Sequence, residues 1–428
     1  FLQKIISLHI NIYHLYRNVK FKGDEMKKYS VNSFAFESGE RFCHVIDKLS
    51  GEPVYYPNLY ILTQVRNRSN SINTMLSIAG ILVLLHRWFS ANDIDIEERV
   101  LKLRFLNCNE IDSLCDYMSM NFKIKKINPA HKMICTENPT KYFRLSVVCD
   151  YLEWFCQIHL SQSNGKGTRS KMDKFIRELK SKKPLKKDRY KKEISDKALS
   201  RKQLDLLFSI IKPGSELNPF TDLVQARNRL MILMLFSFGV RAGELLNLRV
   251  SDIDFFGSTI SIKRRANDKS DPRRNQPLVK TGERIIPVGE ALMGEIYNYI
   301  TMDRNRINKS QKNDFVFITY KAGDTNGMPL SISAYHKIID LISKSHPELS
   351  ELCGHQLRHT WNYEFSMNMD EMNEGVSQER EEQIRSYLMG WSIGSGTARI
   401  YNRRHIIKEA HKTSLIMQQG LMRGCFYE

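Results

Sequence analysis

The sequence lacks the residue patterns that identify a disulfide-stapled or zinc-binding module. None of its eight cysteines forms a C-x-x-C pair, and no spacing of Cys and His matches a zinc site. Cysteines scattered through a chain of 428 residues are typical of free thiols in a reducing cytosol. We therefore predict a cytoplasmic protein without a disulfide framework.

The sequence also lacks an uninterrupted apolar run long enough to cross a bilayer, which takes about 20 residues. Its longest such run, Met75 to Leu85, is better explained as a buried helix. Phe1 to Tyr16 has no charged start, apolar middle and small-residue cleavage site of the kind that marks a signal peptide. We expect no membrane partner.

Acidic residues are few relative to basic ones. The chain has 47 Asp and Glu against 65 Lys and Arg, which gives a net charge of +18. This excess favours a polyanionic partner, and nucleic acid is the commonest one. A soluble protein that is basic for no binding reason is the alternative on charge alone.

The chain is long enough for two or three domains. Residues 1–55 carry no clear pattern, whereas 56–163 show apolar residues at helical spacing and predict a small helical bundle. Residues 164–197 read as a basic linker. A capping-box pattern at Ser200-Arg-Lys-Gln203 then marks the start of a C-terminal domain, 198–428.

Two basic segments predict phosphate contacts. Between Lys166 and Lys192 there are thirteen Lys or Arg and three acids, and a second basic stretch separates two strand-like segments, 259–263 and 284–288. A solvated charge run that touches nothing is the alternative. The predicted DNA-binding residues are Lys166, Arg169, Lys182, Lys183, Lys186, Lys187, Arg264, Arg265, Arg273 and Arg274.

Two clusters in the C-terminal domain can carry chemistry. Arg241 follows an apolar helix and a glycine turn, with Glu244 three residues on; an exposed Arg and a capping Glu at a helix corner would look the same. His355, Arg358 and His359 share one face of a predicted helix, which suits an anion because Arg gives two parallel hydrogen bonds to phosphate. Metal binding by the two His is less favoured, since no carboxylate accompanies them.

A third cluster combines Gly390, Trp391 and Tyr401 around a glycine-rich turn. Gly394 and Gly396 do not follow a strand, so a dinucleotide site is not indicated. Taken alone, a tyrosine in such a position is usually a packing residue.

Residues from about 195 to 410 resemble the catalytic domain of the tyrosine recombinase (phage integrase) family. The family's first Arg box matches Arg241 with Glu244, and its H-x-x-R-H motif matches His355, Arg358 and His359.

Three further elements keep the family's order along the chain. The family's leucine-Gly-His/Trp element matches Leu388 to Trp391 with one extra residue, and its nucleophile matches Tyr401, ten residues after Trp391. The family's catalytic lysine precedes a strand that reads Glu-Arg-hydrophobic-hydrophobic-Pro, and here that residue is Lys280. The basic insertion lengthens this hairpin, so Lys269 competes with Lys280 for the role.

The resemblance implies a mainly α fold with a small β-sheet. A helical core-type DNA-binding domain at 56–163 would precede the mixed α/β catalytic domain, and together they would form a C-shaped clamp on DNA. Residues 1–55 would then serve for arm-type DNA binding or oligomerisation.

The resemblance also implies a mechanism in which Tyr401 attacks a DNA phosphate and forms a 3′-phosphotyrosine, with no cofactor. Arg241 and Arg358 would clamp the phosphate, His359 or Trp391 would add a hydrogen bond, and Lys280 would protonate the leaving oxygen. His355 would act as base or proton relay, and Glu244 would support the site.

The partners implied by the resemblance are double-stranded DNA recombination sites, three further copies of the chain in a tetramer on two duplexes, and accessory DNA-bending proteins. Such a protein would be associated with the nucleoid. A type IB topoisomerase and a non-catalytic DNA-binding regulator are the alternative functions.

Overall fold

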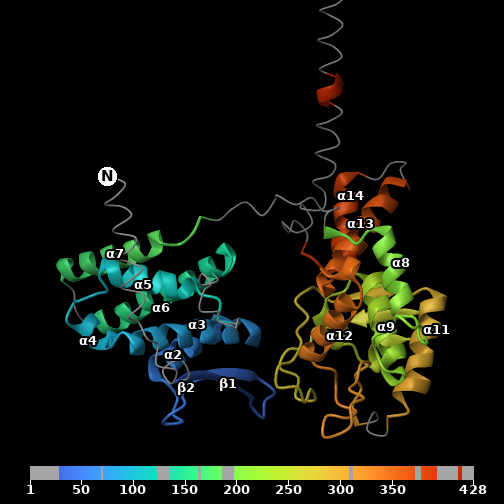
Figure 1. The fold of residues 1–428 in the computed structure, drawn as a ribbon, viewed down its shortest axis with the longest axis horizontal. Coiled ribbons are helices and arrows are strands. Elements are labelled where there is room, and N and C mark those ends of the chain that lie inside the picture. Colours follow the sequence, from blue (N-terminus) through green and yellow to red (C-terminus); the bar gives the residue numbers. More distant parts are fainter. Residues whose placement is uncertain are drawn as a thin grey trace, which may run out of the picture. The chain divides into compact units, whose positions relative to one another are not determined.

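The structure is a computed structural model that describes residues 28–68, 71–122, 135–161, 165–185, 197–307, 312–371, 377–392 and 413–416. The chain divides into two compact units, Phe1–Phe36 with Arg41–Asp188 and Glu37–Glu40 with Arg189–Glu428. Each unit has its own hydrophobic core. The described elements are mainly helices, with one two-stranded and one three-stranded sheet, so the predicted mainly α class is confirmed (Figure 1).

A β-hairpin and a set of helices build the first unit. Strands β1 (Tyr29–Ala35) and β2 (Arg41–Asp47) pair antiparallel, and one face of the hairpin contacts helix α3 (Figure 1). The helices are α2 (Tyr55–Tyr60), α3 (Ile72–Ala91), α4 (Ile96–Leu101), α5 (Cys108–Ser119), α6 (Asn138–Leu160) and α7 (Lys166–Ser181). The hairpin lies in the segment 1–55, where no clear sequence pattern predicted it.

Helix α3 is the central helix of this unit. Ser71 begins it by accepting a hydrogen bond from the backbone N–H of Thr74. By length and hydropathy alone α3 could cross a membrane. Its residues Leu82 and Leu85 are fully buried, and the helix contacts the hairpin, α5 and α6. These contacts make α3 the core helix of the unit.

Helix α7 occupies the first half of the predicted linker. Its residues Phe175, Ile176 and Leu179 are buried in the core of the first unit, and α7 contacts α6. Residues 166–181 therefore belong to the first unit rather than to a linker. The sequence did not predict this packed helix, because its many basic residues leave only a narrow apolar stripe on α7.

The second unit surrounds a small antiparallel sheet with helices (Figure 1). The sheet order is β3-β4-β5, with Ile260 opposite Ile286 in the register of β4 and β5. The strands are β3 (Ile253–Asp254), β4 (Thr259–Ile262) and β5 (Arg284–Pro287), and the helices are α8 (Arg201–Ile210), α9 (Asp222–Phe238), α10 (Ala242–Leu246), α11 (Glu290–Asn298), α12 (Ile332–Ser345), α13 (Gly354–Glu371) and α14 (Gln378–Met389).

Local signals in the sequence explain where several of these helices begin and end. The predicted capping box is present: Ser200 and Gln203 each bond the other's backbone N–H at the start of α8. Helix α9 ends at Gly239 and α14 at Gly390, both in the left-handed conformation that glycine adopts without strain. These two glycine ends lie at the candidate site.

Candidate active site

The last turn of α14 is the point at which the predicted motifs meet. Three consecutive backbone carbonyls there accept hydrogen bonds from distant parts of the second unit. Arg284 Nε donates to Leu388 O at 2.7 Å, Arg358 Nη2 donates to Met389 O at 3.2 Å, and Gly282 N donates to Gly390 O at 2.8 Å. The carbonyl end of α14 is thereby held by β5, by α13 and by the loop before β5.

Arg358 is placed at the ends of two helices. Its Nη1 donates to Gly239 O, at the C-cap of α9, at 2.6 Å, and its Nη2 donates to Met389 O, at the end of α14. The carboxyl ends of helices carry partial negative charge, so they stabilise a buried cation. Arg358 is accordingly only 2% exposed, with its guanidinium 5.4 Å from the centre of the Trp391 ring.

Glu244 connects the Arg box to the sheet. Its fully buried carboxylate pairs with Arg284 Nη2 at 2.7 Å and accepts a hydrogen bond from Thr281 Oγ1 at 2.7 Å. It also accepts from the backbone N–H of Arg241 at 3.3 Å, and Arg241 Nη1 lies 3.5 Å away. Burial by itself would raise the pKa of Glu244, but Arg284, Thr281 and Arg358 outweigh it and the pKa falls below its usual value.

Arg241 is the more accessible of the two predicted phosphate-binding arginines. Its side chain is 32% exposed, and its Nη1 has no hydrogen-bond acceptor among the described residues beyond the ion pair with Glu244. Arg241 is also the N-cap of the short helix α10. Arg241 can therefore offer N–H groups to a ligand.

The loop that carries Lys280 packs directly on the Arg box. A Cβ on Gly243 would lie 2.5 Å from Leu278 O, so only glycine permits this approach. Thr281, the next residue after Lys280, is tied to Glu244, and Gly282 is tied to Gly390. Lys280 itself is exposed between these anchors.

Lys269 lies at the other side of the basic insertion. Its neighbours Asp268 and Ser270 both accept hydrogen bonds from Arg249, which follows α10 by three residues. No anchor of this turn among the described residues reaches the end of α14. The contacts around the two lysines therefore favour Lys280 as the residue nearer the site.

The two histidines lie on α13 as the spacing predicted. The rings of His355 and His359 have centroids 4.6 Å apart and meet edge to face. Partial burial, together with Arg358 and Arg241, lowers the pKa of His355. Burial, His355 and Lys197 lower the pKa of His359 to about 4. Both rings are therefore neutral at pH 7, so each can donate one hydrogen bond and accept one.

Trp391 follows the glycine turn that ends α14. Its backbone N–H donates to Ser386 O at 2.8 Å, which closes the turn around Gly390. The predicted nucleophile Tyr401 lies outside the described residues, as do Lys186 and Lys187. Residues 372–376 also lie outside them.

The structure corrects the predicted DNA-binding role of Arg273. This side chain is 8% exposed, pairs with Asp271 at 2.7 Å and donates to the carbonyls of Leu246 and Leu330 at 2.9 Å. Arg273 therefore fastens the basic insertion to the core, which leaves its guanidinium buried and engaged.

The other basic residues of the insertion divide into paired and exposed ones. Arg265 pairs with the buried carboxylate of Asp252 at 2.5 Å, which offsets its charge. Arg264 and Arg274 are exposed. Of the four arginines predicted to bind DNA in this insertion, Arg264 and Arg274 are therefore the two that are exposed.

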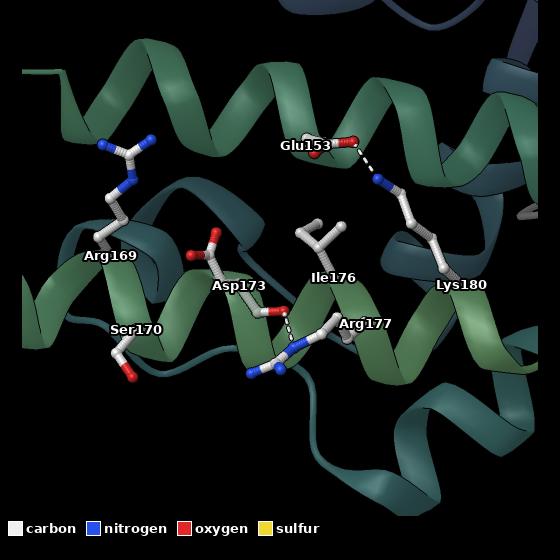
Figure 2. A pocket seen from close by; sticks show the side chains of 7 residues that line it. All are labelled: Glu153, Arg169, Ser170, Asp173, Ile176, Arg177 and Lys180. Atoms are coloured by element: carbon white, nitrogen blue, oxygen red, sulfur yellow. Dashed lines mark hydrogen bonds and ion pairs between the residues drawn. The ribbon is translucent and has the colours of Figure 1, made fainter.

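The predicted basic residues of the first unit line a region of mixed charge. Lys182 pairs with Asp112 at 2.5 Å, and Lys183 lies over the ring of Tyr142. Arg169 borders an open cavity of about 540 Å³ between α6 and α7, lined also by Glu153, Ser170, Asp173, Ile176, Arg177 and Lys180 (Figure 2). Glu153 pairs with Lys180 across it at 2.6 Å. Lys166 begins α7.

No group of three or more His, Cys, Asp or Glu that could hold a metal ion occurs among the residues placed by the structure. The charged groups that act on the two neighbouring His of α13 among the described residues are the cations Arg358, Arg241 and Lys197. The donor set does not fit a divalent cation.

Comparison with known proteins identifies the family. Residues 197–405 match the phage integrase family. This match places that part of the chain in the tyrosine recombinase family. The chain is 27% identical to tyrosine recombinase XerD of Halalkalibacterium halodurans over 140 residues, and this aligned region covers 33% of the chain and 40% of that protein. The chain is 24% identical to transposase A of transposon Tn554 from Staphylococcus aureus over 307 residues, and this aligned region covers 71% of the chain and 78% of that protein.

Solved structures of this recombinase family are also similar to the chain. A Tn1549 transposon integrase in complex with circular intermediate DNA aligns with 80% of this chain and 94% of its own, at 17% identity and a TM-score of 0.41. The XerH site-specific recombinase bound to its difH substrate aligns with 78% of this chain and 94% of its own, at 14% identity and a TM-score of 0.37.

Sequence reasoning missed Arg284 and Thr281. The signal for Arg284 was its position: in the alternating strand β5 it shares the inward phase with Ile286. A charged residue in that phase needs a buried partner, and Glu244 supplies it. Thr281 carries no comparable signal.

Proposed function

We propose that this recombinase breaks and rejoins DNA at specific sites and so integrates or excises a mobile element. The observation that carries the proposal is the convergence of three motifs near the end of α14. The Arg241–Glu244 box, the Lys280 loop and the His355-to-His359 segment are far apart in sequence, yet a chain of hydrogen bonds links them there.

Tyr401 is the proposed nucleophile. Its phenol attacks a DNA phosphorus, a 3′-phosphotyrosine bond forms, and the bond to the 5′ oxygen breaks. The covalent intermediate retains the energy of the phosphodiester, so a 5′-hydroxyl can later reverse the step and join new DNA. No cofactor takes part in this scheme.

The neighbouring side chains divide the remaining work. Arg241 offers N–H groups to the non-bridging oxygens, the positive charge of the buried Arg358 helps to neutralise them, and His359 or Trp391 donates a further hydrogen bond. Neutral His355 accepts the phenol proton, since its lowered pKa leaves a ring nitrogen free of a proton at pH 7. Lys280 gives a proton to the leaving oxygen.

We further propose that the protein acts on duplex recombination sites in the cytoplasm, associated with the nucleoid. Four protomers would assemble on two duplexes, with accessory DNA-bending proteins as additional partners. Each protomer would clamp DNA between the first compact unit, which includes the hairpin and α7, and a catalytic domain at 198–428. Residues 1–55 would add arm-type DNA binding or oligomerisation. The exposed Arg264 and Arg274 support phosphate contact by the second unit.

Covalent trapping tests the proposal. The full chain is incubated with a pool of nicked duplexes of random sequence, in which cleavage releases a short fragment and traps the protein on DNA. We expect a covalent adduct with the wild-type chain and none with Tyr401→Phe. Tyr387→Phe is the matched control, because that side chain is 61% exposed and lies outside the proposed chemistry.

Two results would refute the proposal. If the wild-type chain forms no adduct while it binds the duplexes, the cleavage reaction is absent. If Tyr401→Phe forms as much adduct as wild type, Tyr401 is not the nucleophile. Relaxation of a supercoiled plasmid that lacks the trapped sequence would instead indicate a topoisomerase.

A further inference from the structure

A second polar cluster is buried beside the candidate site, between α13 and α14, two helices that lie side by side in Figure 1. It consists of Asn362 and Ser366 on α13 and of Glu381 and Arg385 on α14, and we call it the Arg385 cluster. Arg385 is fully buried and Asn362 is also 0% exposed, while Ser366 and Glu381 are each 4% exposed. None of the proposed reaction steps uses these residues.

Arg385 spans the two helices. Its Nη1 donates to Asn362 O at 3.0 Å, its Nη2 donates to Ser366 Oγ at 2.8 Å, and it pairs with Glu381 one turn earlier on α14. Its guanidinium also lies 4.6 Å from the centre of the Phe365 ring. The planar fork therefore reaches two points of α13 that are one helical turn apart.

The same cluster touches the candidate site. Asn362 Nδ2 donates to Arg358 O at 2.8 Å and contacts Met389 Sδ at 3.5 Å. Met389 O in turn accepts from Arg358. Asn362 therefore lies between Arg385, the backbone of Arg358 and the last residue of α14.

Stability alone is a poor reason for such a cluster. An apolar pair of similar volume at a buried ion-pair position is often as stable as the ion pair or more so. What a buried Arg fork adds is a fixed register, because its hydrogen bonds are satisfied in only one axial position of the helices. A one-turn slip of α14 along α13 would keep the Arg385–Glu381 pair, because both residues are on α14, but it would take the Arg385 fork away from Asn362 O and Ser366 Oγ on α13.

We propose that Arg385 is a positioning residue that sets the register of α14 against α13 and thereby the place of Trp391 over Arg358. The proposal rests on the proposed cleavage reaction. Trp391 is joined to α14 through Ser386 O, adjacent to Arg385, so a shift of α14 moves the indole directly.

The test compares variants of the full chain on the duplex sequence that wild type selects from the nicked pool. Glu381→Leu with Arg385→Met removes both charges and keeps side-chain volume. The matched control is Asp340→Asn with Lys344→Gln, which removes an exposed ion pair of the same spacing on α12. Melting temperature, affinity for the duplex and the single-turnover cleavage rate at saturating DNA are measured for each.

We expect the double variant of the cluster to melt within a few degrees of wild type, to bind DNA within about twofold, and to cleave at least tenfold more slowly. Amide exchange at residues 386–391 should be faster than in wild type, a readout that does not depend on activity. Arg385→Lys, which keeps the charge next to Glu381 but not the fork, should have an intermediate rate.

The outcomes separate the two proposals. If wild type itself does not cleave, the proposed function fails, and amide exchange alone then decides on the cluster. If wild type cleaves and the folded double variant cleaves equally fast, the positioning role is refuted. If the double variant does not fold, a wild-type cleavage rate in Arg385→Lys refutes it.

Discussion

Replacing Arg284 by Met tests whether the Glu244–Arg284 pair holds the site together. Both side chains are almost completely buried and their charged atoms are 2.7 Å apart. Removing one partner of a buried pair destabilises a protein by about 3–5 kcal/mol, because the other charge is left uncompensated. A melting temperature lowered by roughly 6–20 °C follows for a domain of this size.

The effect should also depend on pH in a defined direction. Without Arg284, the carboxylate of Glu244 can escape its burial by taking up a proton, which requires about 3 kcal/mol at pH 7 and less at lower pH. Its pKa in the folded variant therefore rises above the unfolded value, and the deficit of Arg284→Met should shrink as the pH falls towards 5. In wild type the pKa of Glu244 is lowered, so its stabilisation is lost only below about pH 4.5.

The assay is thermal or urea unfolding of the full chain, followed between pH 5 and pH 8. Lys344→Met is the control, because it breaks a 2.6 Å ion pair whose side chains are 70% and 57% exposed. Such surface pairs contribute about 0–1 kcal/mol. Equal, small effects of the two substitutions, or a deficit that does not vary with pH, would show that the buried pair does not anchor the site.

Three further outcomes follow from the structure. Gly243→Ala should slow cleavage at least tenfold with DNA affinity retained, whereas Gly294→Ala, where an added Cβ meets nothing within 4 Å, should leave the cleavage rate unchanged. Arg274→Ala should lower DNA affinity and reduce the slope of the logarithm of the binding constant against the logarithm of the salt concentration by about one. Arg273→Ala should instead lower the melting temperature, because that side chain is buried. The reverse pattern would show that Arg273 contacts DNA after all. Wild type should lose stability as the pH falls from 6.5 to about 4, because the lowered pKa of His359 makes it resist protonation only in the folded state. His359→Asn should lose about 1 kcal/mol less over this range, and identical acid unfolding curves of the two proteins would refute this.

Local patterns made most helices of the second unit and part of the site predictable. The spacing of His355, Arg358 and His359 predicted that they share one helix face, and helix α13 carries all three. The capping box at Ser200 was visible because its two bonds join residues three apart. Such signals depend only on neighbours in the sequence.

The sequence by itself determined the residue types of the site, their order along the chain and the helices and strands that carry them. Only the tertiary structure decided which side chains are buried and which remain open to a ligand. Periodicity placed Arg358 on a ligand-facing side, yet the ends of α9 and α14, each far from it in sequence, meet there and bury it. Burial of Arg273, Arg284 and Arg385 has the same cause, because a buried cation needs partners that folding brings from elsewhere in the chain.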